Sequence, residues 1–99
     1  MNTKKEEYFF LDVREEEEFA MDFNQNSLNM PVRKVLSVGY GFSNGFWESM
    51  IPKDLVIVVY CSSGKRANRA YEALNNKNYK TENVKTLEEA KKFYNSLTN

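Results

Sequence analysis

The chain has 99 residues, 41% of them hydrophobic and 14% aromatic, so it is long enough for one domain and too apolar for a disordered segment. Fourteen basic residues balance fourteen acidic ones, so no net charge favours nucleic acid or a membrane surface as a partner. No apolar stretch has the length of a membrane span or of a signal-peptide core. We therefore expect a single domain over residues 1–99, without a nucleic-acid or membrane partner.

The N-terminal third alternates between short segments of strand and helix character. Residues 8–13 form an apolar run that predicts a buried strand. Residues 15–21 predict a short helix, because its acidic residues crowd the first turn, where the helix dipole favours them. Residues 28–30 predict a brief strand that ends before Pro31, which keeps the residue before it extended.

The middle of the chain, residues 33–54, has the weakest pattern. It predicts one helical turn at Val35-Leu36 and a short helix near 43–50, between glycines that break regular structure. Aromatic side chains recur here, and we expect them to form a small apolar cluster that either packs against the core or walls a pocket. They are Tyr40, Phe42, Phe46 and Trp47. The role of residues 37–50 stays open.

The second half has the clearest elements. Residues 55–60 predict a central strand, residues 65–75 an amphipathic helix, and residues 83–85 a short final strand. Thr86 with Glu89 forms a helix-start signature that opens a helix to about Leu97. Strands alternate with helices, so the fold class is α/β, with a small, mainly parallel sheet flanked by helices on both faces.

Cys61 is the only cysteine, and it stands where the apolar run over residues 55–60 meets a short polar loop. A single thiol forms no intramolecular disulfide, and with no histidine in the chain it makes a poor zinc site, so we expect no metal and no cofactor. A free cysteine suits a reducing compartment, so we expect a cytoplasmic location. Cys61 is then either a packed core residue or a nucleophile.

The loop after Cys61 favours the nucleophile. A tight strand-to-helix loop directs backbone N–H groups at its own centre, and the helix N-terminus adds partial positive charge. Gly64 allows a sharp turn there. Lys65 and Arg66 add full positive charges that would attract an anionic donor, while Ser62 and Ser63 can donate hydrogen bonds to an anion. These effects stabilise a thiolate over a thiol.

Three motifs together resemble those of rhodanese-like domains. Leu11-Asp12-Val13-Arg14, followed by Glu15 and Glu18-Phe19, is similar to that family's opening motif. The run Cys61-Ser62-Ser63-Gly64-Lys65-Arg66 resembles its active-site loop, and Asn29-Met30-Pro31 lies where the family has a related element. The motifs stand in the family's order and cover roughly residues 8–75. Elsewhere the chain departs from the family pattern, as at Ala67 and at residues 24–28 and 88–93.

The resemblance implies a sulfurtransferase that carries sulfur as a persulfide on Cys61. The donor would be a small anion such as thiosulfate, and the acceptor a thiol, cyanide or a sulfur-accepting protein. The main alternative is a sulfur-relay or protein-interaction module that turns over small donors poorly. A phosphatase-like or arsenate-reducing activity is disfavoured, because the related phosphatases have a loop one residue longer.

Three further residues are expected to support the site. For Asp12 and Arg14 a structural role is favoured over a chemical one. Asp12 is expected to be a strand-end carboxylate that bonds loop amides, and Arg14 is expected to pair with it. For Arg69 two roles stay open, steering the substrate or pairing with Glu72 on the surface. The acidic run Glu15–Glu18 is expected to be a solvated helix face.

Overall fold

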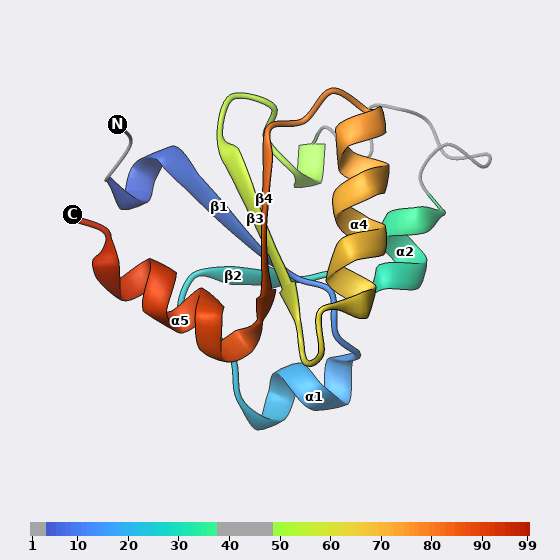
Figure 1. Ribbon diagram of the computed structural model, residues 1–99, viewed down its shortest axis with the longest axis horizontal. Helices are drawn as coiled ribbons and strands as arrows, with labels where there is room; N and C mark the ends of the chain where they lie inside the picture. Colours follow the sequence, from blue (N-terminus) through green and yellow to red (C-terminus); the bar gives the residue numbers. More distant parts are fainter. Residues whose placement is uncertain (1–3, 38–48) are drawn as a thin grey trace.

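The computed structural model describes residues 4–37 and 49–99 of the chain. Its strands form one four-stranded sheet in the order β2-β1-β3-β4, and every neighbouring pair runs parallel (Figure 1). The expected parallel α/β sheet is therefore confirmed. The strands are β1 (Tyr8–Asp12), β2 (Ser27–Asn29), β3 (Val56–Cys61) and β4 (Thr81–Thr86).

Helices lie on both faces of this sheet, as the sequence predicted. The α2 and α4 helices cover one face and α5 covers the other, while α1 lies below the end of the sheet in Figure 1. A short 3-10 helix, η1 (Lys5–Glu7), precedes β1. The helices are α1 (Glu16–Met21), α2 (Val32–Leu36), α4 (Lys65–Asn76) and α5 (Leu87–Ser96). No helix in the described ranges is both long and apolar enough to cross a membrane.

Two apolar clusters fill the space between the sheet and its helices, because successive strand residues point to opposite faces. Ile57, Val59 and Cys61 of β3 belong to the larger cluster, together with the buried residues of α2 and α4. Val58 and Tyr60 point the other way and pack with the buried residues of α5. Cys61 therefore lies on the α4 side of the sheet, under the helix that its own loop begins.

Several element boundaries differ from the sequence-based expectation. The β3 strand ends at Cys61 itself, one residue later than expected, and β4 begins at Thr81 instead of Asn83. Since β4 is an edge strand with several polar residues, its apolar pattern is too weak to mark its start. The expected helix near 43–50 lies outside the described residues except for 49 and 50. The aromatic cluster of residues 40–47 lies wholly outside them.

The carboxyl ends of the parallel strands meet at one edge of the sheet, where ligands bind in folds of this kind. There Asp12 of β1 stands beside Tyr60 of β3, and Cys61 stands beside Thr86 of β4. The α1, α4 and α5 helices all begin within four residues of these strand ends. Residues from separate parts of the chain thus gather around the loop after Cys61.

Candidate active site

Cys61 is the last residue of β3, and it is fully buried at 0% exposure. Its Sγ accepts a hydrogen bond from the backbone N–H of Gly64 at 2.9 Å and a longer one from Ala67 at 3.4 Å. Two amides of the loop and first turn of α4 therefore point at the sulfur. Donors in this position stabilise negative charge on the sulfur more than they stabilise a neutral thiol.

Gly64 is required at its position for two reasons. Its φ of +96° lies in the left-handed region, which costs a residue with a side chain conformational strain. A Cβ at this position would also lie 3.3 Å from the Cβ of Lys85 on β4. The glycine that the sequence placed at the turn thus lets the loop close against the neighbouring strand.

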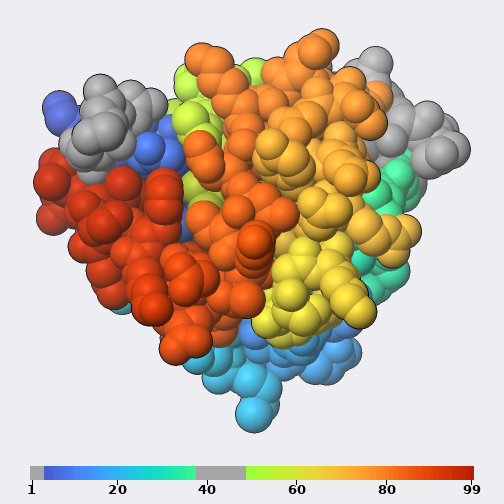
Figure 2. Space-filling model, viewed as in Figure 1, coloured from blue at the N-terminus to red at the C-terminus, as the bar shows by residue number. Residues whose placement is uncertain are grey.

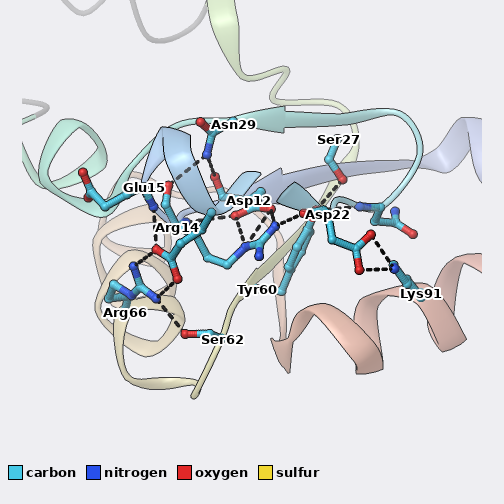
Figure 3. A network of polar contacts seen from close by, with 12 residues as sticks. Asp12, Arg14, Glu15, Asp22, Ser27, Asn29, Tyr60, Ser62, Arg66 and Lys91 are labelled. Atoms are coloured by element: carbon cyan, nitrogen blue, oxygen red, sulfur yellow. Dashed lines mark hydrogen bonds and ion pairs between the residues drawn. The ribbon is translucent and has the colours of Figure 1, made fainter. Parts of the chain in front are cut away.

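Arg66 is tied to α1 and to its own loop. Its guanidinium donates to the two carboxylate oxygens of Glu18 at 2.6 and 3.0 Å and to the Ser62 hydroxyl at 2.7 Å (Figure 3). The hydrogen bond from Arg66 holds the pKa of Glu18 at about 2, and the same bond raises the pKa of Arg66. The guanidinium expected to meet a donor anion is therefore already neutralised by a carboxylate.

The expectation of a solvated face over Glu15–Glu18 is wrong for Glu18. Glu15 and Glu16 do form surface ion pairs, with Arg33 and Lys34. Glu18 instead belongs to the site, and its sequence position contained a usable signal. It lies in the first turn of the helix that follows β1, the strand next to β3, so its side chain reaches the Cys61 loop.

Asp12 and Arg14 form a buried ion pair at the end of β1, beside the strand that leads to Cys61. The carboxylate of Asp12, at 0% exposure, accepts from the guanidinium of Arg14 at 2.7 Å. The same carboxylate also accepts a hydrogen bond from the backbone N–H of Arg14 at 2.9 Å. Asp12 therefore bonds a backbone amide in the turn that follows β1. Asn29 completes the support, since its amide donates to the carbonyl oxygens of both residues. The scaffolding role of Asp12 and Arg14 stays a prediction.

Lys65 and Arg69 lie on the outer side of the loop and are exposed. The alternative of a surface pair between Arg69 and Glu72 is not observed, because Glu72 is contacted by Asn68 at 3.4 Å and not by Arg69. Ser63 is exposed beside them. Lys65, Arg69 and Ser63 line an open hollow of about 520 Å³ together with Lys85. Lys85 is not predicted from the sequence, because a polar edge strand carries no motif.

Within residues 4–37 and 49–99, no group of three metal-ligating side chains is placed to hold a metal ion.

The sequence matches the rhodanese-like domain family over residues 1–93, so the chain belongs to that family. It is 35% identical over 80 residues to a Schizosaccharomyces pombe protein named "Putative thiosulfate sulfurtransferase, mitochondrial". The match covers 71% of this chain and 52% of that protein. The chain thus spans about half the length of this curated relative.

Solved structures of the same fold agree with the family assignment. A rhodanese from E. coli, solved with anions, superposes with a TM-score of 0.68 at 25% identity and covers 83% of this chain and 89% of its own. A human single-domain sulfurtransferase has a TM-score of 0.64 at 24% identity, with coverages of 79% and 74%. Because the human protein is only 24% identical to this chain, the similarity to it supports the fold assignment and nothing further.

Proposed function

We propose that the protein transfers sulfane sulfur from thiosulfate, or a similar small anion, to a nucleophilic acceptor through a persulfide on Cys61. Membership of the rhodanese-like family supports sulfurtransferase activity in general, as does the name of the S. pombe relative. The observation that carries the proposal is the pair of N–H groups of Gly64 and Ala67 directed at the Cys61 sulfur.

The reaction has two displacement steps on sulfur. The Cys61 thiolate attacks the outer sulfur of thiosulfate, a new S–S bond forms, and the S–S bond of thiosulfate breaks with its electron pair leaving on sulfite. The acceptor nucleophile then attacks the outer sulfur of the persulfide, and Cys61 leaves as a thiolate. No oxidant is consumed, and the thiolate is regenerated in each cycle.

The loop residues have separate roles in this proposal. The N–H groups of Gly64 and Ala67 stabilise charge on the sulfur in both steps, since they are fixed before the reaction begins. Arg66 holds the loop in shape through Glu18 and Ser62. Lys65 is exposed beside the loop, and it supplies the positive charge that attracts an anionic donor.

A second candidate is the sulfur-relay module, which receives and passes sulfur between proteins and turns over small donors slowly. The exposed side chains of Lys65 and Arg69 beside the loop favour it, because a protein partner can contact them directly. The two candidates share the persulfide and differ in the rate of its formation from thiosulfate. For either one we propose a reducing compartment such as the cytoplasm, where Cys61 stays free.

The test is a steady-state assay with thiosulfate as donor and cyanide as acceptor, in which thiocyanate is measured. The wild type should show saturable turnover, and Cys61→Ser should show none while keeping its fold by circular dichroism. Full turnover in Cys61→Ser would exclude the persulfide mechanism. Turnover near the uncatalysed rate in a wild type that still accepts sulfur from a protein persulfide would favour the relay module.

A further inference from the structure

A hollow next to the active-site loop is lined by cations from two segments of the chain. Lys65 and Arg69 come from the first turns of α4, and Lys85 comes from the end of β4. Figure 2 shows these segments beside each other on the front face, α4 in yellow to gold and β4 in orange. No described residue that lines the hollow is acidic, so its wall is positive although the chain has no net charge.

The cations of this hollow are not neutralised by acidic side chains. In residues 4–37 and 49–99, Lys65, Arg69 and Lys85 form no ion pair. Like charges gathered in one hollow repel each other, and a negatively charged ligand removes that repulsion. The hollow is therefore suited to an anionic partner.

The backbone of β4 is distorted where it places Lys85 in this hollow. The pairing of β3 with β4 shifts register after Val59, and Lys85 has a φ of +74°, which is uncommon for a residue with a side chain. The Asn83 side chain stabilises the distortion by accepting from the backbone N–H of Lys85 at 2.9 Å. Irregularities of this kind re-aim side chains next to functional sites. Lys85 lies next to Gly64 at this point of the strand.

The surroundings fit a protein partner better than a small molecule. Small-molecule sites are enclosed and mostly apolar, whereas this hollow is open and its cations are exposed. On the α1 side of the loop, Met21 is 86% exposed and Phe23 is 50% exposed, with Phe23 stacked on Phe19 at 5.0 Å. Exposed apolar side chains of this kind are enriched at protein interaction surfaces.

We propose that the cationic hollow of Lys65, Arg69 and Lys85 binds an acidic segment of a protein that exchanges sulfur with Cys61. This inference rests on the proposed function, because it names the class of acceptor for the same persulfide. Carboxylates on the partner protein form ion pairs with Arg69 and Lys85. These ion pairs bring the thiol of the partner to the loop. Such pairing also accelerates encounter at low salt.

The first experiment compares three acceptor peptides, each with one cysteine, flanked by glutamates, by lysines, or by serine and glycine. The protein is loaded with sulfur from thiosulfate, its mass is checked, and the transfer rate to each peptide is measured. We expect the acidic peptide to react at least about tenfold faster than the lysine peptide at low salt, with the ratio falling as salt rises. Neighbouring glutamates make a thiol less ionised, so intrinsic reactivity favours the opposite order. Equal rates, or a faster lysine peptide, would overturn the inference.

A binding measurement separates this inference from the proposed function. The same peptides with serine in place of cysteine are labelled with fluorescein, and their anisotropy is followed against the unloaded protein. Failure of sulfur loading would refute the proposed function. Absence of a preference for the acidic peptide in this binding measurement would refute the docking surface, whatever the loading result.

Matched charge reversals locate the binding surface. Arg69→Glu/Lys85→Glu should weaken binding of the acidic peptide by at least about tenfold at low salt. The control Lys4→Glu/Lys80→Glu changes the net charge equally. Lys4 and Lys80 precede β1 and β4, so they lie at the amino ends of the strands, whereas the loop lies at the carboxyl ends. If both double variants lose binding equally, net charge alone is responsible and the hollow is not the site. Arg69→Gln/Lys85→Gln replaces the first variant if that variant unfolds.

Discussion

Replacing Glu18 by glutamine tests whether the contact between α1 and the Cys61 loop stabilises the fold. The substitution keeps the size of the side chain but removes the charge that pairs with Arg66 over distances of 2.6 and 3.0 Å. The pKa of Glu18, at about 2 against an ordinary 4.5, would correspond to about 3 kcal/mol for a fully buried pair. Glu18 is 35% exposed, however, so solvent screening reduces the expected loss to about 1 kcal/mol.

The pH dependence gives this prediction its sign. Because the pKa of Glu18 is lower in the folded state, the pair stabilises the fold above the ordinary pKa of 4.5, and this contribution is lost as the pH falls toward about 2. Urea denaturation should show a difference of about 1 kcal/mol between wild type and Glu18→Gln near neutral pH, and a smaller one near about pH 3.

The matched control is Glu16→Gln, since Glu16 is 64% exposed and its oxygen lies 3.6 Å from the Lys34 ammonium. This control should change the free energy of unfolding by less than about 0.5 kcal/mol. A Glu18→Gln variant as stable as the Glu16→Gln control, at every pH, would show that the contact between Glu18 and Arg66 does not stabilise the fold.

Two other substitutions probe the support of the site. Gly64→Ala should lower the free energy of unfolding by about 1–3 kcal/mol, because alanine is strained at a φ of +96° and its Cβ meets Lys85; unchanged urea denaturation would show that the loop relaxes freely. Asp12→Asn leaves the buried guanidinium of Arg14 without its counter-charge and should cost about 3–5 kcal/mol. A loss below about 1 kcal/mol in thermal denaturation would mean that Arg14 finds another partner.

The sequence predicted the fold well where apolar periodicity was strong. The amphipathic helix expected over residues 65–75 is confirmed as α4, which buries Ala67, Ala70 and Leu74. The helix expected after Thr86 is confirmed as α5, which buries Ala90 and Tyr94. The start of β4 was missed, because an edge strand with several polar residues has no clear apolar pattern.

The loop residues of the candidate site followed from local sequence, but their partners did not. Cys61 and Gly64 act through neighbours a few positions away, so their arrangement can be inferred from a strand-loop-helix pattern. Glu18 meets Arg66 across 48 positions, and Lys85 of β4 lies next to Gly64 of the loop after β3. Such contacts depend on strand order and register, which no local pattern in a single sequence specifies.

The most direct test of the central claim is the intact mass of the protein before and after incubation with thiosulfate, beside Cys61→Ser. We expect a gain of one sulfur atom in the wild type alone, and its removal by cyanide. A wild type with no added sulfur would contradict the claim that thiosulfate loads Cys61, and the same gain in Cys61→Ser would contradict the claim that Cys61 carries the sulfur.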